Sequence, residues 1–189
     1  MRNAKALALG AIVITGCAFD GARRLDRPAR FQLGVNSRQL AQPNGDGFAA
    51  RTSNPQSQPG VLADHATTFD AQFTMSHYHS TYVGVEAEAG TLGNDGSNYA
   101  AALGIAGLEQ PLARGALGVE LAGGRRWLRA NVDSDDVRDW TVEARAHARL
   151  WLGEKAAFGA ALGVDPQGSW MAGVSLSVYS NIFNRWGQQ

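Results

Sequence analysis

The sequence predicts an all-β protein, an up-and-down antiparallel β-barrel of about eight strands and of the membrane-spanning type. Segments that alternate apolar and polar residues recur along most of the chain, and the clearest is 140–152 (WTVEARAHARLWL). A period of two places successive side chains on opposite faces of a strand. The segment would span roughly 40 Å at about 3.3 Å per residue, ample for a tilted membrane strand. Long and short connections between the segments, and charges of both signs on the polar faces, are the other two observations behind this prediction.

The composition fits short strands joined by turns. The chain has 189 residues, enough for one domain, and its 17 basic residues balance 17 acidic ones, so no excess of positive charge indicates nucleic acid as a partner. Glycine occurs 23 times. No apolar run approaches the length of a transmembrane helix, and a membrane barrel would not contain one, because its signal is alternation.

The amino end is typical of an exported protein. Arg2 and Lys5 precede an apolar run over 6–14, and small residues follow, as in a secretory signal peptide. The sequence Ile14-Thr15-Gly16-Cys17 resembles the lipobox of bacterial lipoproteins. That resemblance implies that Cys17, the single cysteine, is lipidated and begins the mature protein; an ordinary signal cleaved nearby is the alternative. We expect a signal peptide over 1–16, a lipidated linker over 17–28, the barrel over 29–183 and a periplasmic tail over 184–189.

Four strands are expected in the first half of the barrel. The segments 29–40 (ARFQLGVNSRQL), 68–76 (TFDAQFTMS) and 82–89 (YVGVEAEA) alternate apolar and polar residues. The segment 99–107 (YAAALGIAG) is almost wholly small and apolar and is also interpreted as a strand.

Four more strands are expected in the second half. The segment 117–122 (LGVELA) continues as 125–131 (RRWLRAN), with a possible β-bulge at Gly123-Gly124. The segment 140–152 follows an acidic loop. The last two strands are 156–164 (AAFGAALGV) and 169–179 (SWMAGVSLSVY).

The connections predict an orientation. With the amino end in the periplasm, as a lipid anchor requires, the external connections would be 41–64, 90–98, the 123–138 region and 165–168. The periplasmic ones would be 77–80, 109–115 and 153–154. Outer-membrane barrels have short periplasmic turns and longer external loops, and three of the four expected external connections fit that rule.

Alternation by itself leaves open whether the apolar faces point to lipid or into a soluble core. Charges of both signs can pair inside a narrow lumen filled with side chains, whereas isolated buried charges would be prohibitive. The apolar faces are rich in Ala and Val, which are small for a soluble core. Large aromatics lie near the expected strand ends and are interpreted as two membrane girdles: Tyr78, Tyr82, Tyr99, Trp127, Trp140, Trp170 and Tyr179. We therefore predict that the apolar faces point outward.

Over most of 29–179 this pattern resembles the small eight-stranded outer-membrane barrels, the class of the OmpA transmembrane domain and OmpX. The resemblance is architectural and implies a barrel whose lumen is filled. Members of that class commonly end the last strand with an aromatic residue at the carboxyl terminus, whereas this chain continues past Tyr179, Phe183 and Trp186 to Gln189. A lipidated amino end is also atypical of the class.

Two groups of candidate site residues follow. The inward polar faces are expected to form a charge network, with a proton or ion path as the alternative. At the outer rim, Arg125, Trp127 and Arg129 share a parity and are candidates for contact with lipopolysaccharide phosphates, or they are ordinary rim residues. The predicted network comprises Arg30, Asp70, Glu86, Glu88, Glu120, Glu143, Arg145, His147 and Arg149, with Arg38 on the same face as Arg30.

Other motifs are weak candidates for chemistry. His77 and His79 could share a face as a metal pair, but no third ligand is evident, and a polar turn explains both. His79-Ser80 has poor geometry for a base and a nucleophile, because adjacent strand residues point to opposite faces. The acidic run 133–136 lacks the spacing and glycine of a calcium loop. We predict no metal, no cofactor and no catalysis.

The sequence therefore predicts a lipid-anchored, membrane-spanning outer-membrane lipoprotein of a Gram-negative bacterium, with a structural or surface-interaction role. Its expected partners are outer-membrane lipids and lipopolysaccharide, and a protein partner could bind the external loops 41–64, 90–98 and 132–138. Two alternatives remain: a periplasmic lipoprotein whose soluble, lipocalin-like barrel binds an apolar ligand, and a barrel enzyme that modifies lipid.

Overall fold

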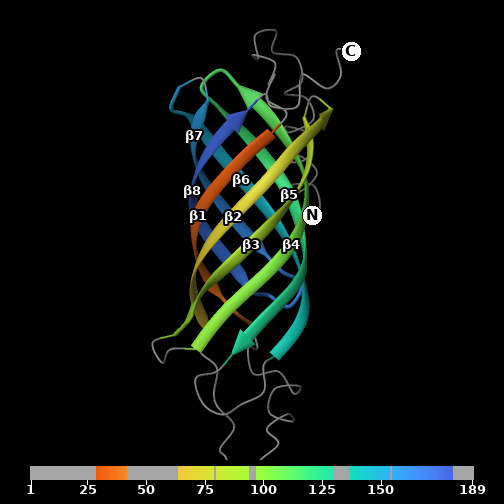
Figure 1. The fold of residues 1–189 in the computed structure, drawn as a ribbon, viewed down its shortest axis with the longest axis vertical. Coiled ribbons are helices and arrows are strands. Elements are labelled where there is room, and N and C mark those ends of the chain that lie inside the picture. The colour runs from red at the N-terminus through yellow and green to blue at the C-terminus, as the bar shows by residue number, and fades with distance from the viewer. Residues whose placement is uncertain are drawn as a thin grey trace, which may run out of the picture.

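The computed structural model describes residues 29–41, 64–78, 80–93, 97–129, 137–153 and 155–180, and these form one closed barrel of antiparallel strands (Figure 1). The predicted all-β, up-and-down barrel is confirmed. The eight strands, in chain order, are β1 (Ala29–Gln39), β2 (His65–Tyr78), β3 (Thr81–Leu92), β4 (Ser97–Leu112), β5 (Gly115–Arg129), β6 (Val137–Trp151), β7 (Ala156–Val164) and β8 (Trp170–Ser180).

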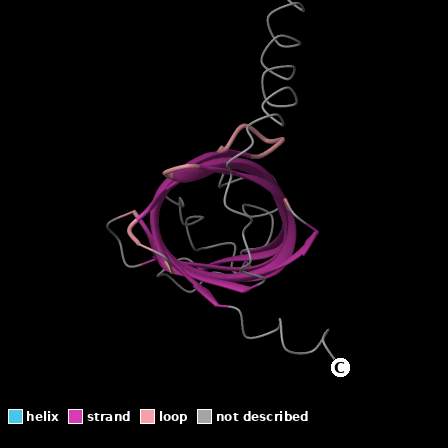
Figure 2. Ribbon diagram, turned by 90° about the horizontal axis from the view of Figure 1, so that it is seen from above, coloured by secondary structure: helices cyan, strands magenta, loops and turns pink. Residues whose placement is uncertain are grey.

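Each strand pairs with its neighbours in sequence, and β1 pairs with β8 to close the ring, from Ala29 opposite Ser180 to Gln39 opposite Trp170. Figure 2 shows the closed ring of strands seen along the barrel. Closure leaves no unpaired strand edge, so the backbone groups of the described strands can be satisfied without water.

The barrel has the polarity of a membrane protein. Large apolar side chains lie on the outer wall, where Phe69, Val85 and Leu162 are 65%, 62% and 67% exposed. Charged side chains lie inside, where Arg38 and Glu88 are each 3% exposed. A soluble lipocalin-like barrel requires the opposite arrangement, so that alternative does not fit this structure.

The expected β-bulge in β5 is wrong. The pairings of β5 with both neighbours run without interruption through Gly123 and Gly124, so no bulge lies there. The register shifts instead between Ser76 and Tyr78, where β2 meets the turn into β3. Gly123, with outward parity, and Gly124, with inward parity, therefore lie in a regular stretch of strand.

Several strands are longer than the alternation indicates. β4 continues through Pro111, which pairs with Ala116, so the expected connection 109–115 is reduced to the two-residue turn 113–114. β3 and β4 extend to Leu92 and Ser97, so the expected loop 90–98 is also shorter. Pro111 is tolerated near the strand end because a proline removes only its own N–H from the ladder.

The ends of the strands alternate between the two rims. The connections after β1, β3, β5 and β7 lie at one rim, the lower one in Figure 1, and those after β2, β4 and β6 lie at the other. The longest gap between strands, from Gln39 to His65, is at the lower rim. Within the described residues no helix is long and apolar enough to cross a membrane.

The expected aromatic girdles are only partly correct. Trp140 and Trp170 do lie on the outer wall, 72% and 48% exposed. Three of the tyrosines, Tyr82, Tyr99 and Tyr179, are instead buried inside the barrel. The Tyr82 hydroxyl donates to Glu120, and the Arg38 guanidinium lies 5.4 Å from the centre of the Tyr99 ring, so buried tyrosines pack beside the charged groups.

Candidate functional site: the charged interior and the outer rim

The nine side chains predicted for the lumen network all lie inside the barrel and are buried, as is Arg38. They come from five strands: Arg30 from β1; Asp70 from β2; Glu86 and Glu88 from β3; Glu120 from β5; and Glu143, Arg145, His147 and Arg149 from β6. β6 contributes four of them because its alternation places every second residue inward.

Two arginines and three glutamates form the larger group, here called the Arg38–Arg145 cluster. Arg38 binds both carboxylate oxygens of Glu88 at 2.7 Å, and Arg145 binds both of Glu86 at 2.8 and 3.0 Å. Glu143 joins the two arginines, 2.5 Å from Arg38 and 2.9 Å from Arg145. Bidentate contacts of this kind are the strongest interactions between a guanidinium group and a carboxylate.

A second group, the Glu109 cluster, lies nearer the upper rim of Figure 1. Glu109 of β4 accepts contacts from three cationic or titratable side chains: Arg30 at 3.2 Å, His147 at 3.2 Å, and Arg149. The Arg30 guanidinium also lies 4.8 Å from the centre of the Tyr82 ring. One carboxylate thus neutralises charge from two strands, β1 and β6.

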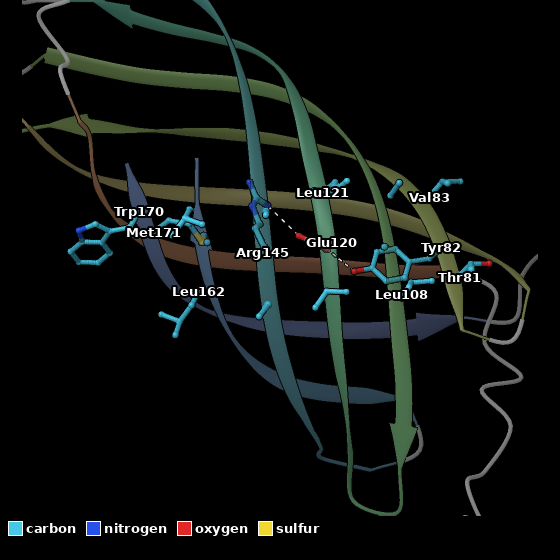
Figure 3. Close-up of a pocket in the computed structure, with 17 residues that line it drawn as sticks. Thr81, Tyr82, Val83, Leu108, Glu120, Leu121, Arg145, Leu162, Trp170 and Met171 are labelled. Atoms are coloured by element: carbon cyan, nitrogen blue, oxygen red, sulfur yellow. Dashed lines mark hydrogen bonds and ion pairs between the residues drawn. The ribbon is translucent and has the colours of Figure 1, made fainter. Parts of the chain in front are cut away.

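Glu120 and Gln72 connect the two clusters. The Glu120 carboxylate accepts the Tyr82 hydroxyl at 2.7 Å and lies 3.3 Å from Arg145, and Figure 3 shows both contacts. Gln72 accepts from Arg30 at 2.6 Å and donates to Glu86 at 3.2 Å. The polar interior is therefore one hydrogen-bonded network that spans much of the barrel's height.

The described interior carries more carboxylates than guanidinium groups. Asp70 is the least compensated of the acids: one oxygen accepts from Asn36 at 2.9 Å, and the other, buried, has no hydrogen-bond partner among the described residues. Asp70 also pairs in register with Glu88. Among the buried residues of the strands, the carboxylates are Asp70, Glu86, Glu88, Glu109, Glu120 and Glu143, and the guanidinium groups are Arg30, Arg38, Arg145 and Arg149.

Glycines on neighbouring strands make room for this network. A Cβ atom at Gly34 would collide with the Asp70 carboxylate, and one at Gly107 would collide with the Tyr82 ring. Near the lower rim the lumen is instead apolar. Leu40, Leu92, Tyr99 and Leu128 belong to one buried cluster there. Charged and apolar layers together fill the interior, as expected for a barrel of eight strands.

The interior charged groups contact one another across the barrel. Among the described residues no group of three or more His, Cys, Asp or Glu side chains could hold a metal ion. The His77 and His79 side chains and the acidic run 133–136 lie outside the described residues. So does Cys17, together with the signal, linker and tail segments and most of the expected partner loop 41–64.

The rim residues predicted to contact lipopolysaccharide face outward. Arg125, Trp127 and Arg129 share the parity of Leu121, which is 59% exposed. Two residues of β6 join them on the same surface, because Arg125 pairs with Trp140, and Trp127 pairs with Arg138. Arg126, between them, points inward and binds Asp139 at 3.0 Å and 2.5 Å.

Two residues that contact the charge network, Glu109 and Tyr82, are not among those that the sequence predicts for it. The sequence places Glu109 in the short connection 109–115, which contains Pro111, and it places Tyr82 in a membrane girdle. In the structure Glu109 shares the inward parity of Tyr99 and Leu103. If the alternation is continued past Gly107, it places the Glu109 side chain inside the barrel.

The comparisons with known proteins show the fold. No family model matches the chain, and no curated protein is significantly similar in sequence. Among solved structures, the chain is similar to Neisserial surface protein A (NspA), with 8% identity and a TM-score of 0.56 over 80% of this chain and 97% of that one. It is likewise similar to the N-terminal β-barrel domain of Pseudomonas aeruginosa OprF, with 12% identity and a TM-score of 0.53 over 82% and 98%.

A third similar structure is Ail, the attachment invasion locus protein of Yersinia pestis, with 9% identity and a TM-score of 0.50 over 81% of this chain and 97% of that one. These proteins share the small eight-stranded barrel with this chain. The chain thus has the fold of the small outer-membrane β-barrels.

Proposed function

We propose that the chain is an outer-membrane β-barrel lipoprotein with a structural or surface-interaction role and without a catalytic step. The observation that carries the proposal is the inverted polarity of a closed barrel: Val85 and Leu162 are exposed on the wall, while Arg38 and Glu143 are buried inside. Such a wall is stable in a bilayer and unfavourable in water.

The proposed orientation places the lower rim of Figure 1 outside the cell. The connections between strands at the upper rim are short, as in the turn 113–114, while the gap from Gln39 to His65 is at the lower rim. Short turns on the periplasmic side and longer loops outside are the rule for outer-membrane barrels. A protein partner would then bind at the lower rim, through the segments 41–64 and 132–138.

The interior supports a static role. The interior guanidinium and carboxylate groups are held mainly by one another, so a wide pore is not part of the proposal. Lipidation at Cys17 rests on the lipobox-like sequence and would add an anchor at the amino end.

The test uses a Cys17→Ser protein that carries a cleavable signal peptide from another exported protein. Membranes are washed with carbonate, and electrophoretic migration is compared with and without boiling. A membrane-spanning barrel stays in the membrane and shifts on boiling. Release of a soluble monomer by the wash would overturn the proposal. Incorporation of labelled palmitate into the wild type, and none into Cys17→Ser, tests the anchor separately.

A further inference from the structure

On the described strands, the outer wall carries residues with formal charge at one place only. Those residues are three arginines, and all lie near the lower end of the β5–β6 pair: Arg125 and Arg129 on β5, and Arg138 on β6. The other arginines, aspartates and glutamates of these strands have the inward parity. Charged groups on a lipid-facing wall are costly near the middle of a bilayer and acceptable at its edges, so this grouping calls for a physical explanation.

The arginines alternate with tryptophans across the strand pair. Arg125 lies opposite Trp140, and its guanidinium carbon is 5.6 Å from the centre of that indole. One pair further toward the rim, Trp127 lies opposite Arg138, and Arg129 follows on β5. We call these five residues the arginine–tryptophan surface.

The height of this surface matches a membrane boundary. On β6 the outward residues from Leu150 to Val142 are apolar, and Trp140 ends the series. At about 3.3 Å per residue and a tilt of roughly 40°, Leu150 and Trp140 are about 25 Å apart along the barrel axis, which is the height of the apolar band of a membrane barrel. Arg125 is therefore at the boundary, and Arg129 and Arg138 lie just beyond it.

The chemistry of the surface suits a phosphorylated lipid. A guanidinium group binds two phosphate oxygens at once, and an indole at the boundary packs against acyl chains while its N–H faces the headgroups. On these two strands Asp139 has inward parity and binds Arg126, so the outward-facing residues with formal charge are all arginines.

We infer that the arginine–tryptophan surface binds the phosphate groups of lipid A, the membrane-embedded part of lipopolysaccharide. The inference rests on the proposed function, because that orientation places the lower rim in the outer leaflet. It adds Arg138 and Trp140 to the three rim residues that the sequence indicates. Three guanidinium groups on one short stretch of wall fit a lipid with two phosphates better than one with a single phosphate.

The test measures lipid binding to the refolded mature chain in detergent, by native mass spectrometry, with bisphosphorylated lipid A, monophosphoryl lipid A and phosphatidylglycerol as probes. We expect wild type to bind bisphosphorylated lipid A most tightly. The variant Arg125→Gln/Arg129→Gln/Arg138→Gln should bind it at least roughly tenfold more weakly, because it loses the charge-assisted hydrogen bonds from the guanidinium groups to phosphate. The control Arg114→Gln/Lys155→Gln removes two exposed charges from the opposite rim and should leave binding unchanged.

Equal affinity of the triple variant and wild type for lipid A would overturn the inference. So would equal affinity of wild type for lipid A and phosphatidylglycerol, since that result describes a general anionic-lipid surface. Each sample is also run with and without boiling. A barrel that shifts on heating but does not prefer lipid A contradicts only this inference, whereas a chain that never forms such a barrel contradicts the proposed function. Arg125→Gln alone serves if the triple variant does not fold.

Discussion

Arg38 of β1 and Glu143 of β6 meet across the interior of the barrel at 2.5 Å, although 105 residues separate them in the chain. Their strands are not neighbours in the sheet, so the contact ties together opposite parts of the wall. Glu143 also holds Arg145 on its own strand. It is the carboxylate on which the Arg38–Arg145 cluster depends.

Replacing Glu143 with Gln should destabilise the barrel by roughly 3–5 kcal/mol, because two buried guanidinium groups lose a shared counter-charge. Urea-induced unfolding of the refolded protein in lipid vesicles measures the change. The matched control is Asp139→Asn, which breaks the partly exposed pair with Arg126 near the rim and should cost about 1 kcal/mol or less. Equal costs for the two variants would show that the interior pair has no special role.

Asp70→Asn should be tolerated, in contrast to Glu143→Gln. One Asp70 oxygen has no hydrogen-bond partner among the described residues, and the side chain pairs in register with Glu88. Removing an uncompensated charge from a buried site relieves repulsion and desolvation, so the free energy of unfolding should stay the same or rise. The comparison variant is Glu88→Gln, which weakens both contacts to Arg38. This variant should lower the free energy of unfolding. A large loss in Asp70→Asn would mean that its charge is compensated.

Glu109 and Arg149 should be energetically coupled. Glu109→Gln leaves Arg30 and Arg149 without their shared carboxylate, whereas Glu109→Gln/Arg149→Gln removes a charge of each sign. The double variant should therefore be less destabilised than the sum of the two single variants. A double-mutant cycle from urea unfolding gives the coupling, expected within about 0.5–3 kcal/mol. Strict additivity would contradict the ion pair.

A charged residue introduced on the outer wall should destabilise the barrel more near the middle of the bilayer than near its edge. Val85, near the middle of β3, and Thr91, near its lower end, both face outward. Val85→Arg should cost roughly 2–4 kcal/mol of unfolding free energy in vesicles, and Thr91→Arg about 0–1 kcal/mol. Similar small costs at both positions would indicate that β3 does not face lipid.

Because Cys17 is the single native cysteine, labelling of introduced cysteines can establish the orientation. In the Cys17→Ser background, Gln167→Cys places a thiol in an exposed turn at the lower rim, and Arg114→Cys places one in the turn at the upper rim. A membrane-impermeant maleimide should label position 167 in intact cells and position 114 only after the outer membrane is permeabilised. The reverse pattern would invert the proposed orientation.

The sequence by itself determined where the eight strands lie, to within a few residues at their ends, and the face on which most of their side chains lie. Alternation has a period of two, so a single register error would have moved every residue to the wrong side; Arg145, Glu143 and Leu121 all lie on the predicted faces. Predictions failed where alternation was weak, in the small apolar residues of β4 that lead to Glu109, and at Gly123-Gly124.

Only the tertiary structure decided which of the inward groups meet. Alternation predicts whether a side chain points inward or outward, but it does not predict the position of that side chain along the barrel axis. That position depends on how far each strand is displaced along its neighbour when the barrel closes. That displacement brings Arg38 to Glu143 and leaves Asp70 with Asn36. It also places Trp140 beside Arg125. The charge network and the arginine–tryptophan surface are therefore consequences of strand registration.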